Sequence, residues 1–559
     1  MASGWNIISG FAGYISLGQS AFMGLGAYTT AILTLRLHVS PWFMVPLGGV
    51  LATLVAGVLG IVIMRTRGHA FVIITIAFLL ILQLLALNWT SFTGGSNGLT
   101  LPITFFPRDW QYTPFYYALL GVLFLQLGMS WWIRRSKFGM GLIAIREDED
   151  KAAAVGVNTP VYKVLAFMFS AVLIGVAGGV YAYYVTFVDY RGMFNIQNSV
   201  LVVLAALLGG RGTVMGPILG GFAVSILKEQ ANVHFGTSQL NLVVYGAVMA
   251  LVVLFLPRGV IPSVARWAKE RAERASGAIV SGAIDLRPSR LPAGPREDAP
   301  AEPRVLLEVE SLSKRFGGVR AVDDLSFYVK EGTITALIGP NGSGKTTAFN
   351  LITGMMRPDG GRVAFAGTRI DGMPPFQRAH LGLGRTFQIT RLFREMTVLE
   401  NVVAPLRDFA WSRLAADAVA GHEADRALEI LDFVGMAKHA HVVAGALSFG
   451  QQKLVELAQI LMLEPKLVML DEPAGGINPT LIERMVEKIR ELNRMGTTFL
   501  IVEHNMPLVA QLCDPVIVLA RGTRIAAGPA AEIQRDPLVL DAYLGEGWVV
   551  EEAVQEVRA

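Results

Sequence analysis

The sequence predicts two different folds in one chain: a polytopic all-α membrane bundle of about eight transmembrane segments, followed by an α/β domain. The 559 residues are 53% apolar and only 16% charged, whereas soluble proteins have roughly 25% charged residues. The shortage of charge falls almost entirely before residue 260. After residue 305, short β-rich runs alternate with helical patterns, which is typical of an α/β sheet. We therefore expect a membrane domain at 1–258, a linker at 259–304, an α/β domain at 305–548 and a tail at 549–559.

The membrane half contains apolar runs long enough to cross about 30 Å of hydrocarbon as helices. Six of them lie at 7–35, 42–64, 69–88, 114–133, 164–187 and 239–256. A longer run at 196–227 is interrupted by Gly209-Gly210-Arg211-Gly212, so it predicts two short helices joined by a glycine turn. Eight crossings place the basic loop residues on one side, which their charge assigns to the cytoplasm. These residues are Arg65, Arg67, Arg134, Arg135, Lys137, Arg146, Arg211, Arg258, Arg266 and Lys269.

Small and polar residues in these runs predict a packed bundle. Two glycine pairs have the spacing that lets neighbouring helices approach closely: Gly175 with Gly179, and Gly216 with Gly220. Polar groups near the start of the first run would be costly against lipid. We therefore expect them either to face the bundle interior or a polar pathway, or to form hydrogen bonds between helices. They are Ser16, Gln19 and Ser20.

Charge and cysteine content argue against a nucleic-acid-binding protein and against a protein with an internal disulfide. The net charge is +4, but the basic residues form no stripe and lie mainly beside apolar runs, so no nucleic-acid partner is expected. Cys513 is the single cysteine, which excludes an internal disulfide, and we expect it to be buried. The first apolar run lacks a basic leader and is too long for a cleavable signal peptide. Within the linker, Val264–Ala278 reads as a solvated helix or as a basic helix on the membrane surface.

The α/β half contains a phosphate-binding loop. Val305–Val309, Leu325–Val329 and Ile334–Ile338 are predicted strands, and a helix is predicted at Thr346–Ile352. The loop lies between the last strand and this helix, as the motif requires, so its backbone N–H groups would surround phosphates. Lys345 would reach the β- and γ-phosphates of a nucleotide, and Thr346 would bind Mg²⁺ through its hydroxyl. The loop residues expected to bind the nucleotide are Gly339, Asn341, Gly342, Ser343, Gly344, Lys345, Thr346 and Thr347.

An acidic pair follows a second apolar strand. Lys466–Leu470 is a predicted buried strand, and Asp471 and Glu472 come directly after it. Because ligands bind at the carboxyl ends of strands in open α/β sheets, this pair is expected beside the phosphate loop. Asp471 would hold Mg²⁺, and Glu472 would polarise the attacking water. The pattern therefore predicts magnesium-dependent ATP hydrolysis.

Residues 305 to 545 resemble the nucleotide-binding domain of an ATP-binding-cassette transporter, which implies a helical subdomain. The most specific match is Leu447-Ser-Phe-Gly-Gln451, which is similar to the signature sequence of that family. The resemblance implies that this signature, through Ser448, Gly450 and Gln451, caps the γ-phosphate held by a second ATPase subunit. It also implies that Gln388 links the metal site to the permease, that His504 is the switch histidine in catalysis, and that Phe316 stacks on adenine.

Three positions depart from the family pattern. Phe449 stands in the signature where glycine is commonest, and Phe316 replaces the more usual tyrosine. The loop after the acidic pair reads Gly475-Gly-Ile-Asn478 where the family has an aspartate. Backbone amides cap the phosphate and any aromatic ring can stack on adenine, so we expect neither phenylalanine to abolish nucleotide binding.

The main cytoplasmic loop resembles the coupling element of an importer. Ile143–Val157 predicts a short charged helix that a glycine ends, with Arg146, Glu147, Asp148 and Glu149 as the coupling residues. The alternative is a solvated loop helix. The order of permease before ATPase is common in exporters, but exporter bundles have six long helices that reach far into the cytoplasm, unlike the short segments here.

Three further segments resemble the branched-chain (hydrophobic) amino-acid importers: Gly10–Tyr28, Leu208–Pro217 and Asp541–Glu546. The chain therefore resembles the permease and ATPase subunits of that family joined end to end, although those permeases usually have a further membrane segment or two before the match. The resemblance implies a bacterial inner-membrane protein with a cytoplasmic ATPase. Its partners would be a second permease, a second ATPase, an extracytoplasmic binding protein and membrane lipid. Urea, short amides or other carboxylates stay open as alternative cargoes. An exporter and a membrane-anchored regulatory ATPase stay open as alternative functions.

Overall fold

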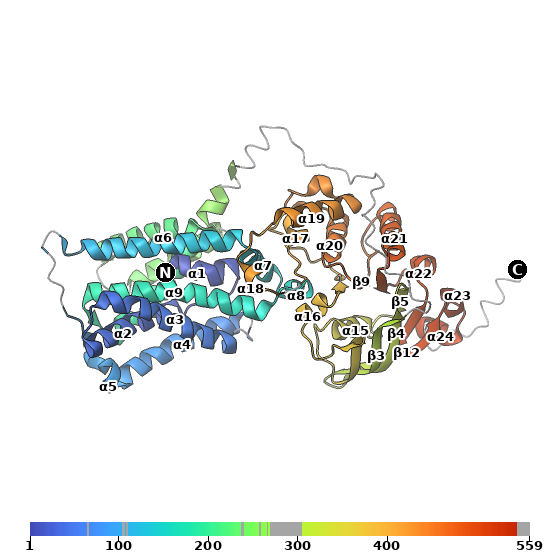
Figure 1. Cartoon of the computed structure of the whole chain (residues 1–559), viewed down its shortest axis with the longest axis horizontal. Coiled ribbons are helices and arrows are strands. Elements are labelled where there is room, and N and C mark those ends of the chain that lie inside the picture. Colours follow the sequence, from blue (N-terminus) through green and yellow to red (C-terminus); the bar gives the residue numbers. More distant parts are fainter. Residues whose placement is uncertain are drawn as a thin grey trace, which may run out of the picture. The chain divides into compact units, whose positions relative to one another are not determined.

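The computed structural model describes residues 1–63, 66, 68–102, 107, 110–235, 240–256, 259–264, 267–268, 304–407 and 409–544. These residues form two compact units (Figure 1). The first contains the membrane helices, from residues 1–146 and 159–281, together with Trp411–Ala418. The second contains Glu147–Asn158 and the α/β domain. Arg65, Arg67, Arg258, Arg266, Lys269, most of the expected linker and the tail at 549–559 lie outside the described residues.

The first unit is a bundle of helices with one small antiparallel sheet. The sheet pairs β1 (Leu99–Thr100) with β2 (Phe187–Val188). The long helices are α2 (Gln19–Leu37), α3 (Pro41–Ile63), α4 (His69–Asn88), α6 (Thr113–Arg135), α7 (Lys137–Glu147), α9 (Thr159–Val185), α11 (Ile196–Gly209), α12 (Gly216–Phe235) and α13 (Leu240–Phe255). The short ones are α1 (Ala2–Trp5), the π-helix η1 (Asn6–Phe11), α5 (Thr90–Thr93), the 3-10 helix η2 (Gly95–Asn97), α10 (Tyr190–Met193) and α18 (Trp411–Leu414).

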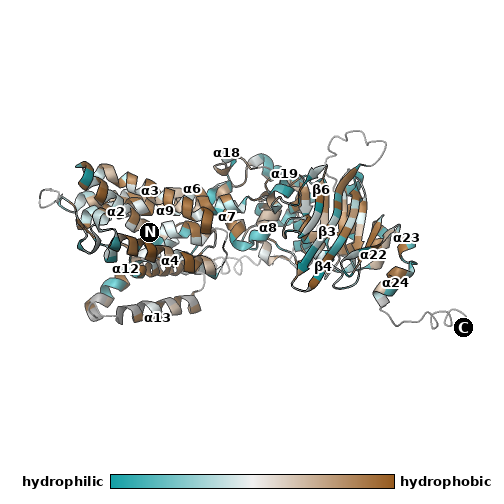
Figure 2. Cartoon of the chain, turned by 90° about the horizontal axis from the view of Figure 1, so that it is seen from below, coloured by the Kyte–Doolittle hydropathy of each residue, from teal (hydrophilic) through white to brown (hydrophobic). Residues whose placement is uncertain are grey.

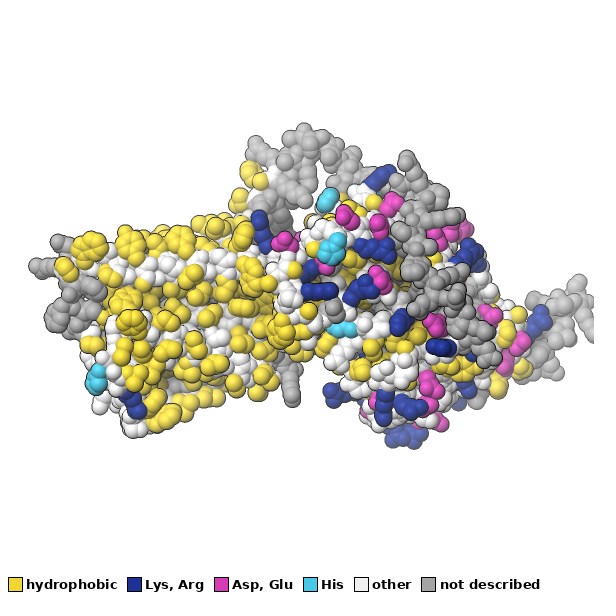
Figure 3. Space-filling view, in the orientation of Figure 1, with side chains coloured by type: hydrophobic (Ala, Val, Ile, Leu, Met, Phe, Trp, Pro, Cys, Tyr) yellow, Lys and Arg dark blue, Asp and Glu magenta, His cyan; other side chains and the backbone are white. Residues whose placement is uncertain are grey.

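Five helices among the described residues are long and apolar enough to cross a membrane. They run over Pro41–Ile63, His69–Asn88, Thr113–Arg135, Thr159–Val185 and Tyr190–Gly209. The other three expected segments correspond to helices α2, α12 and α13, which are shorter or more polar. Figure 2 shows the apolar character of α3 and α4, and hydrophobic side chains cover the visible face of this bundle in Figure 3. The predicted polytopic all-α domain is therefore confirmed.

The first expected span was wrong in its extent. Instead of one helix over 7–35, the chain forms α1 and η1, leaves helical geometry at residues 12–18, and begins α2 at Gln19. Gly13 adopts a left-handed φ of +82°, which ends the first helical stretch. The apolar composition alone does not show such a break, because the residues in the irregular segment are about as apolar as those in the helices on either side.

The glycine turn between α11 and α12 was predicted correctly. Gly210 and Gly212 have positive φ of +122° and +75°. The close approach of helices also occurs as predicted at Gly175, where an added Cβ would lie 2.6 Å from the Ala52 Cβ. At Gly220, an added Cβ would overlap the Ala205 carbonyl oxygen of α11. At Gly216, an added Cβ would meet the Gly210 carbonyl oxygen and the Thr213 hydroxyl of the turn, and also the backbone of Gly209 at the end of α11.

The polar residues near the start of α2 are all buried. Ser16, Gln19 and Ser20 are each 0% exposed. The Ser199 hydroxyl of α11 donates to the Ser20 hydroxyl at 2.9 Å, so Ser20 takes the interhelical role that was one of the two alternatives. The Gln19 side-chain amide has no hydrogen-bond partner among the described residues. These side chains therefore face the bundle interior, where they avoid the high cost of placing polar groups against lipid.

The second unit contains two sheets. The larger has the order β12-β11-β5-β10-β9-β8, in which only the β11–β12 pair is antiparallel. The smaller is antiparallel, with the order β4-β3-β6-β7. The strands are β3 (Val305–Phe316), β4 (Val319–Lys330), β5 (Ile334–Ile338), β6 (Gly360–Phe365), β7 (Thr368–Arg369), β8 (Leu383–Arg385), β9 (Leu467–Asp471), β10 (Thr498–Val502), β11 (Val516–Ala520) and β12 (Thr523–Gly528). The α/β class is confirmed.

Helices surround these sheets. They are α8 (Glu149–Ala154), α15 (Lys345–Ile352), α16 (Pro375–His380), α17 (Val398–Val403), α19 (Gly421–Phe433), α20 (Phe449–Leu461), α21 (Pro479–Arg494), α22 (Met506–Leu512), α23 (Ala530–Ile533) and α24 (Pro537–Leu544), with 3-10 turns η4 (Ala437–His439) and η5 (Ala444–Ala446). Thr397 and Glu400 form a capping box at the start of α17, each side chain bonding the backbone N–H of the other. Cys513 is buried as expected, and burial raises its pKa to about 12.

The predicted charged helix at Ile143–Val157 is two helices. Helix α7 ends at Glu147, and Asp148 caps a separate helix, α8, by accepting from the Lys151 backbone N–H at 2.9 Å. Gly156 ends this segment with a φ of +92°, as predicted. Charged residues are tolerated inside exposed helices, so the acidic run by itself predicts one helix. In the structure, Asp148 instead acts as the N-cap of a second helix.

Candidate nucleotide-binding site

Four neighbouring strands place the predicted residues along one edge of the larger sheet. Strands β5, β10, β9 and β8 are parallel, so their carboxyl ends lie at the same edge. The phosphate loop follows β5, Asp471 ends β9, His504 follows β10, and Gln388 follows β8. This edge is where ligands bind in open α/β sheets. The topology therefore brings together groups that are far apart in the sequence: Gly339 and His504 are separated by 165 positions.

The phosphate loop leads into the N-terminus of α15. Gly344 is the N-cap residue, with a φ of +99° that disfavours any side chain. The Lys345 ammonium donates to the Gly339 and Pro340 carbonyls at 2.7 and 2.9 Å. Burial lowers the pKa of Lys345, an effect that Glu472 and Asp471 oppose. A bound phosphate would favour the charged ammonium in the same way, because it adds negative charge beside a partly desolvated cation.

A hollow beside the loop contains the expected metal ligands. Thr346, Gln388 and Asp471 all line it, as does Asp150 from α8. Asp471 is 2% exposed, and its Oδ1 has no hydrogen-bond partner among the described residues. Burial raises the pKa of Asp471 above its ordinary value, whereas the nearby Arg385 lowers it. Hard oxygen donors with an unpartnered carboxylate oxygen suit Mg²⁺, which takes such ligands together with nucleotide phosphates.

Glu472 lies next to both of its expected neighbours. The Gln388 side-chain amide donates to Glu472 Oε2 at 3.0 Å, and His504 Nδ1 lies 3.9 Å from Oε1. Glu472 itself has a left-handed φ of +47°, which is unusual for a residue with a side chain. Strained backbone of this kind persists where the surrounding structure holds it, and it is found often at functional sites. The structure thus brings Glu472, Gln388 and His504 together at one edge of the sheet.

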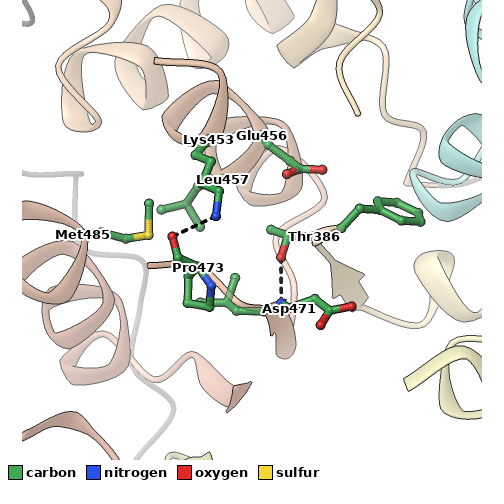
Figure 4. Close-up of a pocket in the computed structure, with 9 residues that line it drawn as sticks. Thr386, Lys453, Glu456, Leu457, Asp471, Pro473 and Met485 are labelled. Carbon is green, nitrogen blue, oxygen red and sulfur yellow. Dashed lines mark hydrogen bonds between the residues drawn. The ribbon is translucent and has the colours of Figure 1, made fainter. Parts of the chain in front are cut away.

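Several supporting residues were missed from the sequence. Lys453 of α20 donates to the Glu472 and Pro473 carbonyls at 2.7 and 3.1 Å. The Thr386 hydroxyl accepts from the Asp471 backbone N–H at 3.1 Å. Figure 4 shows this bond and the Lys453–Pro473 bond around one small pocket. These side chains hold the backbone of the acidic pair from two sides. No local motif marks them, because their partners are backbone groups distant in sequence.

Charged groups also brace the site. Arg385 donates to Asn350 Oδ1 at 2.6 Å and to Asp471 Oδ2 at 3.4 Å, which orients the Asp471 carboxylate. The Glu503 carboxylate is fully buried and accepts from the Ala474 and His504 backbone N–H groups at 3.0 and 2.8 Å. A signal for Glu503 was present in the sequence, since it lies directly before His504 and directly after a buried strand.

The signature residues lie apart from this hollow. Ser448 caps α20, and its hydroxyl accepts from the Gln451 backbone N–H at 3.4 Å while Gln451 Oε1 accepts from the Ser448 N–H at 2.9 Å. Ser448, Gly450 and Gln451 do not line the hollow around Thr346. Phe449 is 41% exposed, and the Lys453 ammonium lies 5.4 Å from its ring centroid. The arrangement leaves Ser448 and Phe449 exposed on the surface of the domain.

Two other predicted positions are surface features. Phe316 at the end of β3 is 48% exposed, with the Lys314 ammonium 6.0 Å from its ring centroid, so its face is accessible for stacking. Asn478 caps α21 by accepting from the Leu481 N–H at 2.8 Å. That capping bond gives Asn478 a structural role at the position where the family has aspartate.

Within the second unit, α8 packs beside the site. The Lys151 ammonium donates to Glu456 Oε1 of α20 at 2.9 Å, and both side chains are buried. Asp148 Oδ2 accepts from Arg391 at 3.2 Å, and the Glu147 carboxylate accepts from the Glu395 N–H at 3.0 Å. Arg146 differs from the other expected coupling residues, because it belongs to the first unit and donates to the Gly10 carbonyl at 2.8 Å.

Comparisons with known proteins cover both halves of the chain. Residues 1–253 match the model of the branched-chain amino acid transport system permease component. Residues 322–475 match the ABC transporter model, and residues 523–549 match the branched-chain amino acid ATP-binding cassette transporter model.

Relatives of the second half are complete ATP-binding subunits. The high-affinity branched-chain amino acid transport ATP-binding protein LivG of Salmonella typhimurium is 41% identical over 43% of this chain and 98% of its own length. BraF of Pseudomonas aeruginosa, described in the same words, is 39% identical over 44% of this chain and 99% of its own. A crystal structure of a nucleotide-free ATP-binding cassette from an ABC transporter is 35% identical over 44% of this chain and all of its own, with a TM-score of 0.40. The chain belongs to the branched-chain amino acid ABC transporter family, and it carries the permease and the ATP-binding cassette in one polypeptide.

Proposed function

We propose that this chain couples ATP hydrolysis to the import of branched-chain or related hydrophobic amino acids across the cytoplasmic membrane. The observation that carries the proposal is the fusion itself: a branched-chain permease match at 1–253 and a branched-chain cassette match at 523–549 occur in one polypeptide. The relatives LivG and BraF are both named as branched-chain amino acid transport ATP-binding proteins. Because both halves point to the same solute class, the permease and the ATPase are matched parts of one importer.

The ATPase residues have distinct proposed roles. Lys345 binds the β- and γ-phosphates, since its ammonium lies inside the phosphate loop. Glu472 accepts a proton from the attacking water, with Gln388 and His504 orienting its carboxylate and the water. Thr346, Gln388 and Asp471 would hold Mg²⁺, which neutralises charge that develops on the γ-phosphate. The Mg²⁺ requirement is part of the proposal.

The assembly is proposed to need a second permease, a second ATPase and an extracytoplasmic binding protein in a bacterial inner membrane. The signature supports this arrangement, because Ser448 and Gly450 do not line the hollow beside their own phosphate loop. A signature on the surface is placed to complete the site of another ATPase subunit. Two ATPase domains closing on nucleotide would then drive alternating access in the permease.

Uptake into proteoliposomes tests the function. The purified chain would be reconstituted with its second permease, its second ATPase and the binding protein, with ATP and magnesium on the cytoplasmic face. We expect radiolabelled leucine, isoleucine or valine to accumulate only with ATP and the binding protein. The Lys345→Ala variant is the matched control, because it should lose nucleotide binding and uptake together. Accumulation of urea or short amides in place of leucine would reject the amino-acid cargo, and ATP-driven loss of preloaded leucine would reject import.

A further inference from the structure

The corner between α6 and α7 leaves two backbone groups that neither helix can satisfy. The Arg135 carbonyl belongs to the last residue of α6, and the Lys137 N–H belongs to the first residue of α7. Carbonyls at the end of a helix and N–H groups at its start have no partner inside the helix. Ser136 and Lys137 are nevertheless buried, at 2% and 6% exposed. A buried corner of this kind needs a hydrogen-bonding partner from elsewhere in the chain.

That partner comes from residues 411–418, which lie in the sequence between two elements of the ATPase, α17 and α19. The Ala418 N–H donates to the Arg135 carbonyl at 2.7 Å, and the Lys137 N–H donates to the Ala416 carbonyl at 2.8 Å. Between these two bonds, Ser136 and Asp417 pair as an antiparallel bridge. The segment thus belongs to the compact unit of the membrane helices. We name residues 411–418 the strap.

We propose that the strap is a second attachment between ATPase and permease, in addition to the segment 147–158. Helix α7 connects the two attachments: the strap binds its first residue, and its last residue leads directly into α8. The permease sequence therefore contributes α8 to the ATPase unit, and the ATPase sequence contributes the strap to the membrane unit. Motion of the ATPase would act on α7 from both ends.

Both of these hydrogen bonds join backbone groups, which predicts how they respond to substitution. Side-chain changes at Ala416 or Ala418 leave the bonds in place, provided that residue 418 keeps its backbone N–H. Proline at 418 removes the donor to the Arg135 carbonyl. Ala420 is the matched control position, because its φ of −74° suits proline and it lies beyond the strap.

Disulfide formation tests the contact directly and does not depend on the cargo. The two hydrogen bonds flank Ser136 and Asp417, so these residues form a non-hydrogen-bonded antiparallel pair. The Cα atoms of such a pair lie about 4.5 Å apart, which is within the range of a disulfide. In a Cys513→Ser background, Ser136→Cys with Asp417→Cys should form a disulfide on mild oxidation. A protease site in the expected linker at 259–304 would then yield fragments that stay joined without reductant. The controls are the single variants Ser136→Cys and Asp417→Cys, which cannot join the two fragments through this pair. Cross-linking no greater than in the controls would overturn the attachment.

Coupling is tested by Ala418→Pro in the reconstituted transporter, and this part rests on the proposed function. We expect leucine taken up per ATP hydrolysed to fall several-fold, with the ATPase activity of the complete transporter in detergent unchanged. Ala420→Pro should leave both unchanged. If the disulfide forms but Ala418→Pro keeps the normal uptake per ATP, the strap is an attachment without a role in coupling, and that part of the proposal is wrong. If unmodified protein also fails to take up leucine, the cargo is wrong and the disulfide result still decides the contact.

Discussion

The Lys151 ammonium and the Glu456 carboxylate form an ion pair at 2.9 Å in which both side chains are almost completely buried. Lys151 lies in α8, and Glu456 lies in α20, the helix that Ser448 of the signature caps. On the same helix, Lys453 holds the Glu472 and Pro473 carbonyls. One helix therefore connects the segment that continues the permease sequence to the signature and to the acidic pair.

Breaking this ion pair should be costly. Lys151→Met leaves the Glu456 carboxylate buried without its partner, which destabilises by about 3–5 kcal/mol. The double variant Lys151→Met with Glu456→Leu should recover most of that loss, because the buried charge is gone. Thermal unfolding of the solubilised protein measures both.

The exposed Arg426–Glu429 pair in α19 provides the control. Removing it with Arg426→Ala should change the free energy of unfolding by at most about 1 kcal/mol, because solvent screens both charges. A single Lys151→Met variant as stable as Arg426→Ala would show that the buried pair does not hold α8 in place.

Glu472→Gln is expected to separate binding from hydrolysis. The amide keeps the size of the side chain but cannot accept a proton from water, so hydrolysis should slow by orders of magnitude while ATP still binds. Binding of a fluorescent ATP analogue and release of phosphate measure the two steps. Glu483→Gln, on the exposed face of α21, is the control and should keep normal turnover. Normal turnover in Glu472→Gln would remove Glu472 from the role of general base.

Magnesium-dependent ATP binding should weaken on acidification at a higher pH than an ordinary aspartate would produce. Burial raises the pKa of Asp471 above its usual 3.8. A cation binds the ionised carboxylate, so protonation competes with it as the pH falls toward the raised pKa and has no effect well above it.

Calorimetric titration in magnesium and in EDTA, repeated over a pH series in the Glu472→Gln background, isolates the magnesium contribution. Asp471→Asn should remove most of the pH dependence of that contribution. An identical pH profile in both proteins would mean that another group binds the metal.

Gly175→Ala should destabilise the membrane bundle. The added methyl group would lie 2.6 Å from the Ala52 Cβ and 3.0 Å from the Gly48 carbonyl oxygen, so α9 and α3 must separate. Overpacking of this kind costs about 1–3 kcal/mol. Gly121→Ala in α6 is the matched control, since no atom lies within 4 Å of the added Cβ. The melting temperature in detergent should fall for Gly175→Ala and stay constant or rise for Gly121→Ala. Equal melting temperatures would contradict the close packing of α9 against α3.

Local patterns were sufficient to predict much of the fold. The β5 strand and the phosphate loop were located to the residue, because a buried strand, a glycine-rich turn and a helix start each have a local signal. The order of strands β5, β10, β9 and β8 came only from the structure, and their parallel pairing brings Glu472, Gln388 and His504 to one edge of the sheet. The first span failed because Gly13 breaks an apolar run without changing its composition.

The two fold classes, the phosphate loop, the acidic pair and the glycine turn between α11 and α12 could be predicted from the amino-acid sequence, because each depends on residues adjacent in the chain. The distant groups that support them became known only from the folded structure. Lys151 meets Glu456 across 305 residues, and the strap meets the α6–α7 corner through backbone atoms that every residue has. Backbone hydrogen bonds leave no mark on residue identity, and a buried lysine becomes acceptable only when folding places a carboxylate beside it.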